Sequence, residues 1–260
     1  MELTDTHCHI HFPDYALDEV EVLQNAADAG VTRLICVGCT LTDSKLAIEI
    51  AERHKNIWAS IGLHPHEGSE YVNDDVALQE FRELATKPKV VAVGETGLDY
   101  HYMHSSKEDQ EKLLRFQLDI ATAHELPLIF HIREAFDDFW RIFDEYVAEG
   151  FKIRGVAHSF SASSKELDQI LERGLYVGLN GIMTFTKDQA QLEAAKRVPV
   201  EKLLLETDAP FLTPTPYRGT ICEPKHVRAT AEFLSQLRGE SLERLAQTTT
   251  QNAINLFGLK

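Results

Sequence analysis

The sequence predicts a (β/α)8 barrel. Short apolar runs with strand character alternate along the chain with segments whose apolar residues recur at helical spacing. Candidate ligands follow several different strands, and a closed barrel brings all its strand ends around one mouth. A doubly wound open sheet is the alternative, but such a sheet concentrates its site at a switch point. No Pro/Gly-rich linker interrupts the alternation, so we expect a single domain over residues 1–260.

Eight runs predict strands. The first alternates in part between apolar and polar residues, and Val90–Val93 is apolar throughout, as expected of a parallel strand buried on both faces. The complete set is Leu3–Ile10, Arg33–Val37, Ile57–Leu63, Val90–Val93, Leu128–His131, Ile153–His158, Leu175–Leu179 and Leu203–Glu206.

The segments between these runs predict helices. Apolar residues recur at helical spacing from Leu17 to Ala29, and Gly30 follows, as expected just past a helix end. Ser105–Glu108 and Ser163–Glu166 fit the capping-box pattern at the start of two later helices. Further helices are expected near residues 43–53, 75–86, 134–148, 187–196, 224–236 and 242–256, and the longest loops near 64–73, 99–105 and 209–223.

The composition is that of a globular protein with an acidic surface. Hydrophobic residues make up 43% of the chain, and the formal net charge is −15. This charge argues against a broad basic face for duplex nucleic acid, but it does not exclude a nuclease whose cations are bound metals. No segment is apolar over the length of a bilayer, and the amino terminus lacks a secretory signal. We therefore expect a cytoplasmic protein without a membrane contact or a stable protein partner.

Glu95 follows the apolar run Val90–Val93, from which only Gly94 separates it. An isolated carboxylate at the end of a buried strand is costly, so it must be paired, protonated or bound to a cation. Packing does not explain such a residue. We interpret Glu95 as a carboxylate that bridges two metal ions.

Five more side chains with metal-ligand chemistry stand at the ends of predicted strands. His7 and His9 share one face of a strand, because side chains alternate with period two, and both can therefore ligate one metal. His131 and His158 each end a strand, and Asp208 follows another. A single histidine in such a place is more often a hydrogen-bonded structural residue. The convergence of several strand ends indicates a metal site instead.

Four histidines, one glutamate and one aspartate suit a pair of divalent cations that share a carboxylate bridge. One ion is expected to take His7, His9, Glu95 and Asp208, and the other Glu95, His131 and His158. These ligand types accept magnesium, manganese or zinc, so the metal stays open. Such a site can polarise a phosphoryl oxygen and activate a bridging water, with Asp208 as the general base. Glu206 either faces the same mouth or supports a ligand from outside.

Three side chains are candidates for contact with a substrate phosphate. His64-Pro65-His66 mimics a ligand pair, but Pro65 breaks the strand geometry, so we expect His66 to reach a phosphate instead. A loop histidine without a role is the alternative. Arg133 and Arg218 could clamp phosphate oxygens. The aromatic residues available to stack on a base, or to serve as wall or core, are Phe160, Phe185, Phe211 and Tyr217.

Four motifs occur in order nearly from end to end of the chain. They are Asp5-Thr6-His7-Cys8-His9, Gly62-Leu63-His64-Pro65-His66, Gly94-Glu95-Thr96-Gly97-Leu98-Asp99-Tyr100, and Glu206-Thr207-Asp208-Ala209-Pro210 with Thr213-Pro214. In these motifs the sequence resembles the TatD family of metal-dependent deoxyribonucleases, within the amidohydrolase superfamily. The resemblance implies a TIM barrel, two divalent metals, and hydrolysis of DNA that is commonly single-stranded and attacked from the 3′ end. It also implies the six metal ligands named above.

Three segments depart from the family pattern. Ala162 replaces a glycine after His158, and Glu134 replaces a shorter acid after His131. Thr220-Ile221-Cys222 stands where the family has two cationic residues and an amide. The last change lowers the expected strength of polynucleotide binding.

Three functions are compatible with these observations. The first is a metal-dependent phosphodiesterase that acts on single-stranded DNA. The alternative is an amidohydrolase-type enzyme for a small phosphoester, lactone or cyclic amide; related barrels often bridge their metals with a carboxylated lysine, and Glu95 at that position favours the first function. The third is a binding or scaffold protein without turnover. The six intact ligands count against it, because such groups gathered without a metal destabilise one another.

Overall fold

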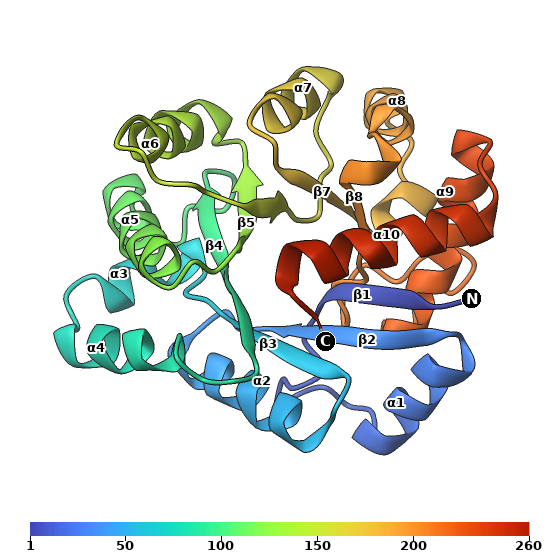
Figure 1. The fold of residues 1–260 in the computed structure, drawn as a ribbon, viewed down its shortest axis with the longest axis horizontal. Coiled ribbons are helices and arrows are strands. Elements are labelled where there is room, and N and C mark those ends of the chain that lie inside the picture. Colours follow the sequence, from blue (N-terminus) through green and yellow to red (C-terminus); the bar gives the residue numbers. More distant parts are fainter. Residues whose placement is uncertain (260) are drawn as a thin grey trace. The chain divides into compact units, whose positions relative to one another are not determined.

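The computed structural model describes residues 1–259, which divide into two compact units (Figure 1). The terminal unit comprises Met1–Cys36 and the chain from His158 onward, and the central unit comprises Val37–Ala157. The strands form one eight-stranded sheet in the order β1-β2-β3-β4-β5-β6-β7-β8.

In the central unit, β3, β4, β5 and β6 pair in parallel and in that order. Its strands are β3 (Ile57–Ile61), β4 (Val90–Asp99), β5 (Leu128–Arg133) and β6 (Gly155–Ala157). Its helices are α2 (Leu41–Arg53), η1 (Pro65–Glu67), α3 (Gly68–Tyr71), α4 (Asp75–Leu84), α5 (Lys107–Ala123) and α6 (Phe136–Ala148).

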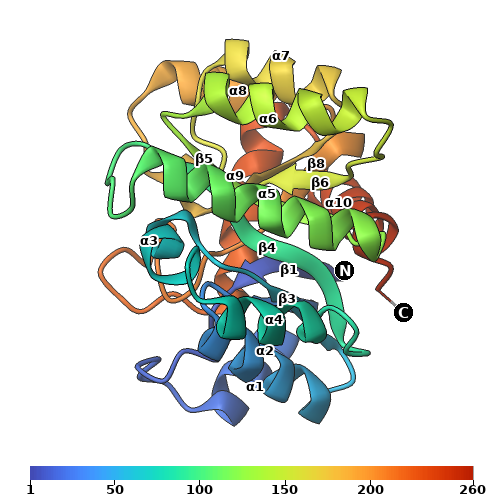
Figure 2. The same ribbon diagram turned by 90° about the vertical axis from the view of Figure 1, so that its left-hand side faces the viewer.

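Two buried glutamines attach α5 to the strand ends of the central unit. The Gln110 amide accepts from Asp99 N at 2.8 Å and donates to Asp99 O at 3.0 Å, at the end of β4. The Gln117 amide makes the same pair of bonds with Leu63, each 2.8 Å long, just past β3. A side-chain amide can thus satisfy both backbone groups where a strand ladder stops. Figure 2 shows α5 beside the long strand β4.

In the terminal unit, β1 pairs with β2 and β7 pairs with β8, both in parallel. Its strands are β1 (Leu3–Cys8), β2 (Val31–Val37), β7 (Tyr176–Leu179) and β8 (Leu203–Leu205). Its helices are α1 (Glu19–Asp28), α7 (Ser164–Glu172), η2 (Gly181–Thr184), α8 (Gln189–Arg197), η3 (Val200–Lys202), η4 (Pro224–His226), α9 (Val227–Arg238) and α10 (Leu242–Phe257).

The first and last strands meet in the terminal unit. Cys8 at the end of β1 forms a parallel bridge with Ala209, four residues beyond β8. The last helix, α10, lies along β1 (Figure 1), and Thr250 on this helix donates to Glu2 O at 3.2 Å. Strands in chain order whose first and last members are neighbours define a (β/α)8 barrel. The predicted fold class is therefore confirmed, and the open-sheet alternative is wrong.

Most predicted elements are shifted by a few residues at their ends, and two differences in the central unit are larger. The predicted strand Val90–Val93 continues to Asp99, because its second half pairs with β5, with Gly97 opposite His131. A Cβ atom at Gly97 would lie 1.9 Å from His131 O, so only glycine permits this approach. The expected loop 64–73 contains η1 and α3. The loop 209–223 is present as predicted.

Among residues 1–259, no helix combines the length and the apolar character needed to cross a membrane.

Candidate metal centre

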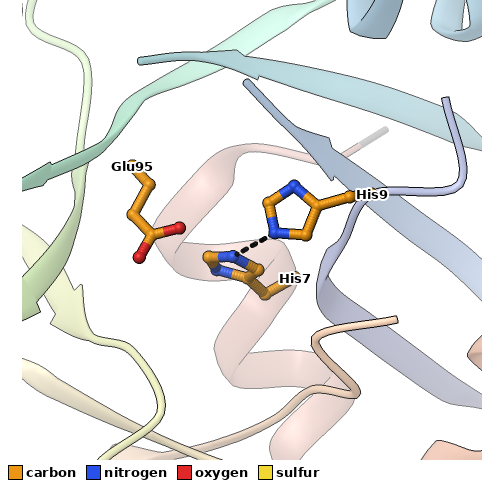
Figure 3. A group of neighbouring side chains, drawn as sticks. All are labelled: His7, His9 and Glu95. Carbon is orange, nitrogen blue, oxygen red and sulfur yellow. Dashed lines mark hydrogen bonds between the residues drawn. The ribbon is translucent and has the colours of Figure 1, made fainter. Parts of the chain in front are cut away.

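Three donor atoms converge in the terminal unit. His7 Nε2 and His9 Nε2 lie 3.1 Å apart, and Figure 3 shows the two rings directed at each other. Asp208 Oδ1 lies 3.5 Å from His7 Nε2 and 3.4 Å from His9 Nε2. Donor atoms this close to one another can all bind one cation.

The backbone brings these three residues together. Asp208 N donates to His7 O at 2.8 Å, and His9 N donates to Ala209 O at 2.7 Å, so the segments that follow β1 and β8 stay paired. Asp208 adopts φ +64°, the left-handed region that aspartate and asparagine tolerate better than most residues. The strand ends and this turn together set the position of the carboxylate.

Asp5 supports this arrangement from the barrel interior. Its fully buried carboxylate accepts from Thr207 N at 2.9 Å, from Thr207 Oγ1 at 2.6 Å and from His7 N at 3.3 Å. Burial raises the pKa of Asp5 well above its usual value in spite of these bonds. Asp5 thus connects β1 to the chain after β8, next to His7 and Asp208.

The pKa of Asp208 is the outcome of opposing effects. Burial by itself raises the pKa, but the hydrogen bond with His9 and the charges of His158, His7 and His9 outweigh it. The pKa of Asp208 therefore lies below its ordinary value. An ionised carboxylate is the form that ligates a metal.

His158 pairs with Glu206 and stacks on His7. The His7 and His158 rings are parallel within 15° at a centroid distance of 3.8 Å. His158 Nδ1 lies 3.3 Å from Glu206 Oε1, which also accepts from Ser159 N at 2.6 Å. The sequence allowed Glu206 either to face the mouth of the barrel or to support a metal ligand. Its contact with His158 fits the second interpretation. The second oxygen of Glu206 is buried and has no hydrogen-bond partner among residues 1–259. A buried carboxylate oxygen of this kind suits a nearby cation.

A second group of donors lies in the central unit. Glu95 Oε1 is 2.7 Å from His131 Nδ1 and 3.5 Å from His64 Nε2. These three residues have ligand atoms close enough to hold one ion. Burial lowers the pKa of His64 to about 4, which leaves a neutral imidazole at pH 7. The sequence interpretation assigned no role to His64, because Pro65 follows it; the proline begins η1 and leaves the His64 ring directed at Glu95.

Asp99 is a residue that the sequence interpretation missed. Its Oδ2 atom lies 2.9 Å from His131 Nε2 and 3.2 Å from His66 Nε2, while Oδ1 accepts from the backbone of His101 and Tyr102. Burial raises the pKa of Asp99, but its hydrogen bonds lower it further, so the net shift is downward. Glu95 and Asp99 stand four residues apart in one strand and so share a face. That spacing could have identified Asp99.

The three predicted substrate residues occupy different environments. His66 contacts Asp99 and lies edge-on to Tyr102, with centroids 5.7 Å apart. Arg133 is exposed, and its guanidinium lies 4.7 Å from the centre of the Tyr102 ring. Arg218 belongs to the terminal unit, where it is exposed and donates to Thr213 O at 2.7 Å. His66 and Arg133 therefore share Tyr102 as a neighbour.

The Asp99 contact leads to a testable prediction. Histidine ligands usually donate their second ring nitrogen to a carboxylate, and removal of such a partner lowers metal affinity by about 10–100-fold. We expect Asp99→Asn to weaken binding of one equivalent of manganese or zinc by this amount, measured by titration of metal-stripped protein. Asp137→Asn, an exposed position on α6, is the matched control. Unchanged affinity in Asp99→Asn would show that Asp99 does not support a ligand.

The donor sets in both units suit divalent ions. Each combines imidazole nitrogens with a carboxylate, and each stands where parallel strands end. The terminal unit offers His7, His9 and Asp208, and the central unit offers His64, Glu95 and His131. These are features of a (β/α)8 metal-dependent hydrolase.

Comparisons with known proteins agree with this class. The TatD related DNase family matches residues 4–258. An uncharacterized metal-dependent hydrolase of Bacillus subtilis, YabD, is 36% identical over 98% of both chains. The 3′-5′ ssDNA/RNA exonuclease TatD of Shigella flexneri is 35% identical over 94% of this chain and 95% of its own. The crystal structure of YjjV, a TatD homologue of Escherichia coli K12, has a TM-score of 0.90 and 31% identity, and the match covers 99% of this chain and 98% of that one.

The chain belongs to the TatD related DNase family. The resemblance noted in the sequence is therefore confirmed, as is the predicted class of metal-dependent hydrolase. The TM-score of 0.90 with YjjV shows that the two chains share a fold.

Proposed function

We propose that this protein is a divalent-metal-dependent exonuclease that removes nucleotides from the 3′ end of single-stranded DNA. The observation that carries the proposal is the convergence of His7 Nε2, His9 Nε2 and Asp208 Oδ1 within 3.5 Å of one another. A relative of similar length, 35% identical to this chain, is named a 3′-5′ ssDNA/RNA exonuclease, which supports the choice of substrate.

Two ions are the proposed cofactor. Their ligands would be His7, His9, Glu95 and Asp208 for one, and Glu95, His131 and His158 for the other. Glu95 would be the shared carboxylate, supported by its 2.7 Å contact with His131. We propose that residues 1–260 act as one hydrolase domain, which the match of a single family to residues 4–258 supports.

Bound divalent ions would polarise a phosphoryl oxygen and lower the pKa of a nearby water. Side chains would carry out the proton transfer. Asp208 would accept the proton of the attacking water as the water oxygen bonds to phosphorus. The bond from phosphorus to the oxygen of the remaining strand would break, and that oxygen would take a proton from solvent. Its pKa lies below the usual value, so the carboxylate is ionised at neutral pH and able to take that proton.

The proposed phosphate contacts are His66, Arg133 and Arg218. His66 and Arg133 are supported by their common neighbour Tyr102, which lies in the loop just after β4. The structure supports a phosphate contact by Arg218 less well, because one guanidinium nitrogen already donates to Thr213 O. The predicted cytoplasmic location stays a prediction.

The proposal is tested by restoring metal to stripped protein. We expect no release of nucleotides from 5′-labelled single-stranded DNA after chelation, and a ladder that shortens from the 3′ end when magnesium, manganese or zinc is added back. The ion that restores the ladder identifies the usable metal. An oligonucleotide with a phosphorothioate 3′ end serves as the control, because it should block shortening from that end.

A different outcome would select the alternative substrate. If DNA stays intact under all three metals while a small phosphoester, lactone or cyclic amide is hydrolysed, the metal chemistry stands and the nuclease proposal is wrong. The formal net charge of −15 favours this alternative, because a negatively charged protein repels a polyanionic strand.

A further inference from the structure

An exposed aromatic side chain stands beside the donor atoms of the terminal unit. Phe211 is 54% exposed, and its ring is edge-on to the rings of His9 and Phe12, each at a centroid distance of 6.5 Å. Phe12 in turn stacks on His9 at 4.6 Å. A large apolar ring left in water loses the free energy that burial would provide. A ligand that covers Phe211 would recover it.

The loop holds Phe211 in a fixed place relative to Asp208. Phe211 N donates to Asp208 O at 2.8 Å and closes a turn between the two residues. The next residue packs closely against η2: a Cβ atom at Gly181 would lie only 2.0 Å from Leu212 O. A backbone that is already fixed loses little conformational entropy when a ligand stacks on the ring it carries.

The same loop has little positive charge with which to grip phosphates. Thr220-Ile221-Cys222 is uncharged, and the Arg218 guanidinium lies 3.9 Å from the centre of the Phe185 ring besides donating to Thr213 O. With a formal net charge of −15, the protein repels a polyanion at long range. Affinity for a nucleic acid strand therefore needs a contribution that does not depend on charge.

We propose that Phe211, backed by Phe12, is the platform on which the nucleobase at the 3′ end of the strand stacks. This inference rests on the proposed exonuclease function and names the part of the substrate that the site recognises. Stacking suits any base, because every base has a π face, and it does not require cationic side chains. The other aromatic candidates fit less well: Phe160 is buried, Phe185 is covered by Arg218, and Tyr217 lies against His226 with centroids 4.9 Å apart.

The experiment compares KM and kcat on two 5′-labelled oligonucleotides that differ only at the 3′ end, one ending in adenine and the other in an abasic nucleotide. We expect Phe211→Ala to raise KM for the adenine end about tenfold with little change in kcat, the size that loss of one stacked base predicts. Phe211→Leu keeps an apolar side chain without a flat ring. Its KM for the adenine end should therefore remain close to that of Phe211→Ala. On the abasic end, wild type and Phe211→Ala should converge.

Two further measurements separate stacking from other effects. Phe151→Ala removes another exposed phenylalanine, 43% exposed in the central unit, and should leave KM unchanged. The difference between wild type and Phe211→Ala should persist as salt is raised, whereas a phosphate contact would weaken.

The outcomes also distinguish this inference from the proposed function. An unchanged KM in Phe211→Ala, with cleavage intact, would overturn the stacking platform and leave the exonuclease proposal standing. An equal loss on the adenine and abasic ends would also overturn it, because the ring would then be acting on something other than the base. If wild type cleaves neither oligonucleotide with magnesium, manganese or zinc, both proposals fail.

Discussion

Asp208→Asn should abolish nearly all hydrolysis while the protein keeps its fold. Loss of a general base typically lowers the rate by about 10²–10⁴-fold, and asparagine cannot accept the proton that Asp208 is proposed to take. Asparagine also tolerates the left-handed backbone that Asp208 adopts at φ +64°, so the turn before Phe211 should be preserved. The measurement is kcat on 5′-labelled single-stranded DNA with the metal that supports cleavage.

Two controls test whether the loss of activity comes from removal of the general base. Asp168→Asn changes an exposed aspartate on α7 that pairs with Arg197, and it should leave kcat unaltered. Elemental analysis of Asp208→Asn should find metal largely retained, because His7 and His9 remain 3.1 Å apart and still converge. Cleavage at the wild-type rate would show that another group accepts the proton.

Glu95→Ala should remove bound metal as well as activity. Glu95 is nearly fully buried, and its Oε1 atom lies 2.7 Å from His131 Nδ1 and 3.5 Å from His64 Nε2. Loss of this carboxylate leaves imidazoles without the negative charge that offsets a divalent cation. Loss of a carboxylate that only supports a ligating histidine lowers metal affinity by about 10–100-fold. We expect a larger loss of metal affinity in Glu95→Ala, because Glu95 is itself a proposed ligand. Elemental analysis of dialysed protein gives the metal content.

The comparison needs variants that separate charge from shape. Glu95→Gln keeps the volume and removes the charge, so it should lose metal too, whereas Glu83→Ala on α4 changes an exposed acid and should keep the full complement. Thermal unfolding of metal-free Glu95→Ala checks that the barrel still forms. A full metal content in Glu95→Ala would refute the shared carboxylate.

The fold class follows from local patterns. Apolar runs of strand length and helical apolar stripes are properties of neighbouring residues, and their alternation was enough to predict the barrel. Residue chemistry at strand ends was similarly local, and it led to His7, His9 and Asp208, whose donor atoms the structure brings within 3.5 Å of one another. The loop 209–223 was predictable for the same reason.

Contacts between segments distant in the chain determine the length of β4 and the surroundings of Asp99 and His64, which the local patterns did not predict. The extension of β4 to Asp99 depends on β5, because each residue from Thr96 to Asp99 pairs with the stretch Phe130–Arg133 of that strand. That extension places Asp99 against His131 and His66, so a residue assigned to a loop contacts a proposed ligand. Similarly, Pro65 disrupts a strand in isolation but leaves His64 directed at Glu95 once the chain is folded.

The sequence by itself determined the barrel class, the metal-ligand chemistry of the strand ends and the family. Only the tertiary structure decided which aromatic side chains face solvent: Phe211 is exposed and Phe160 is buried, although both follow strand-end ligands in the sequence. The physical reason is that exposure depends on which other segments cover a residue. Those segments are distant in the chain, so no spacing within a single motif records them.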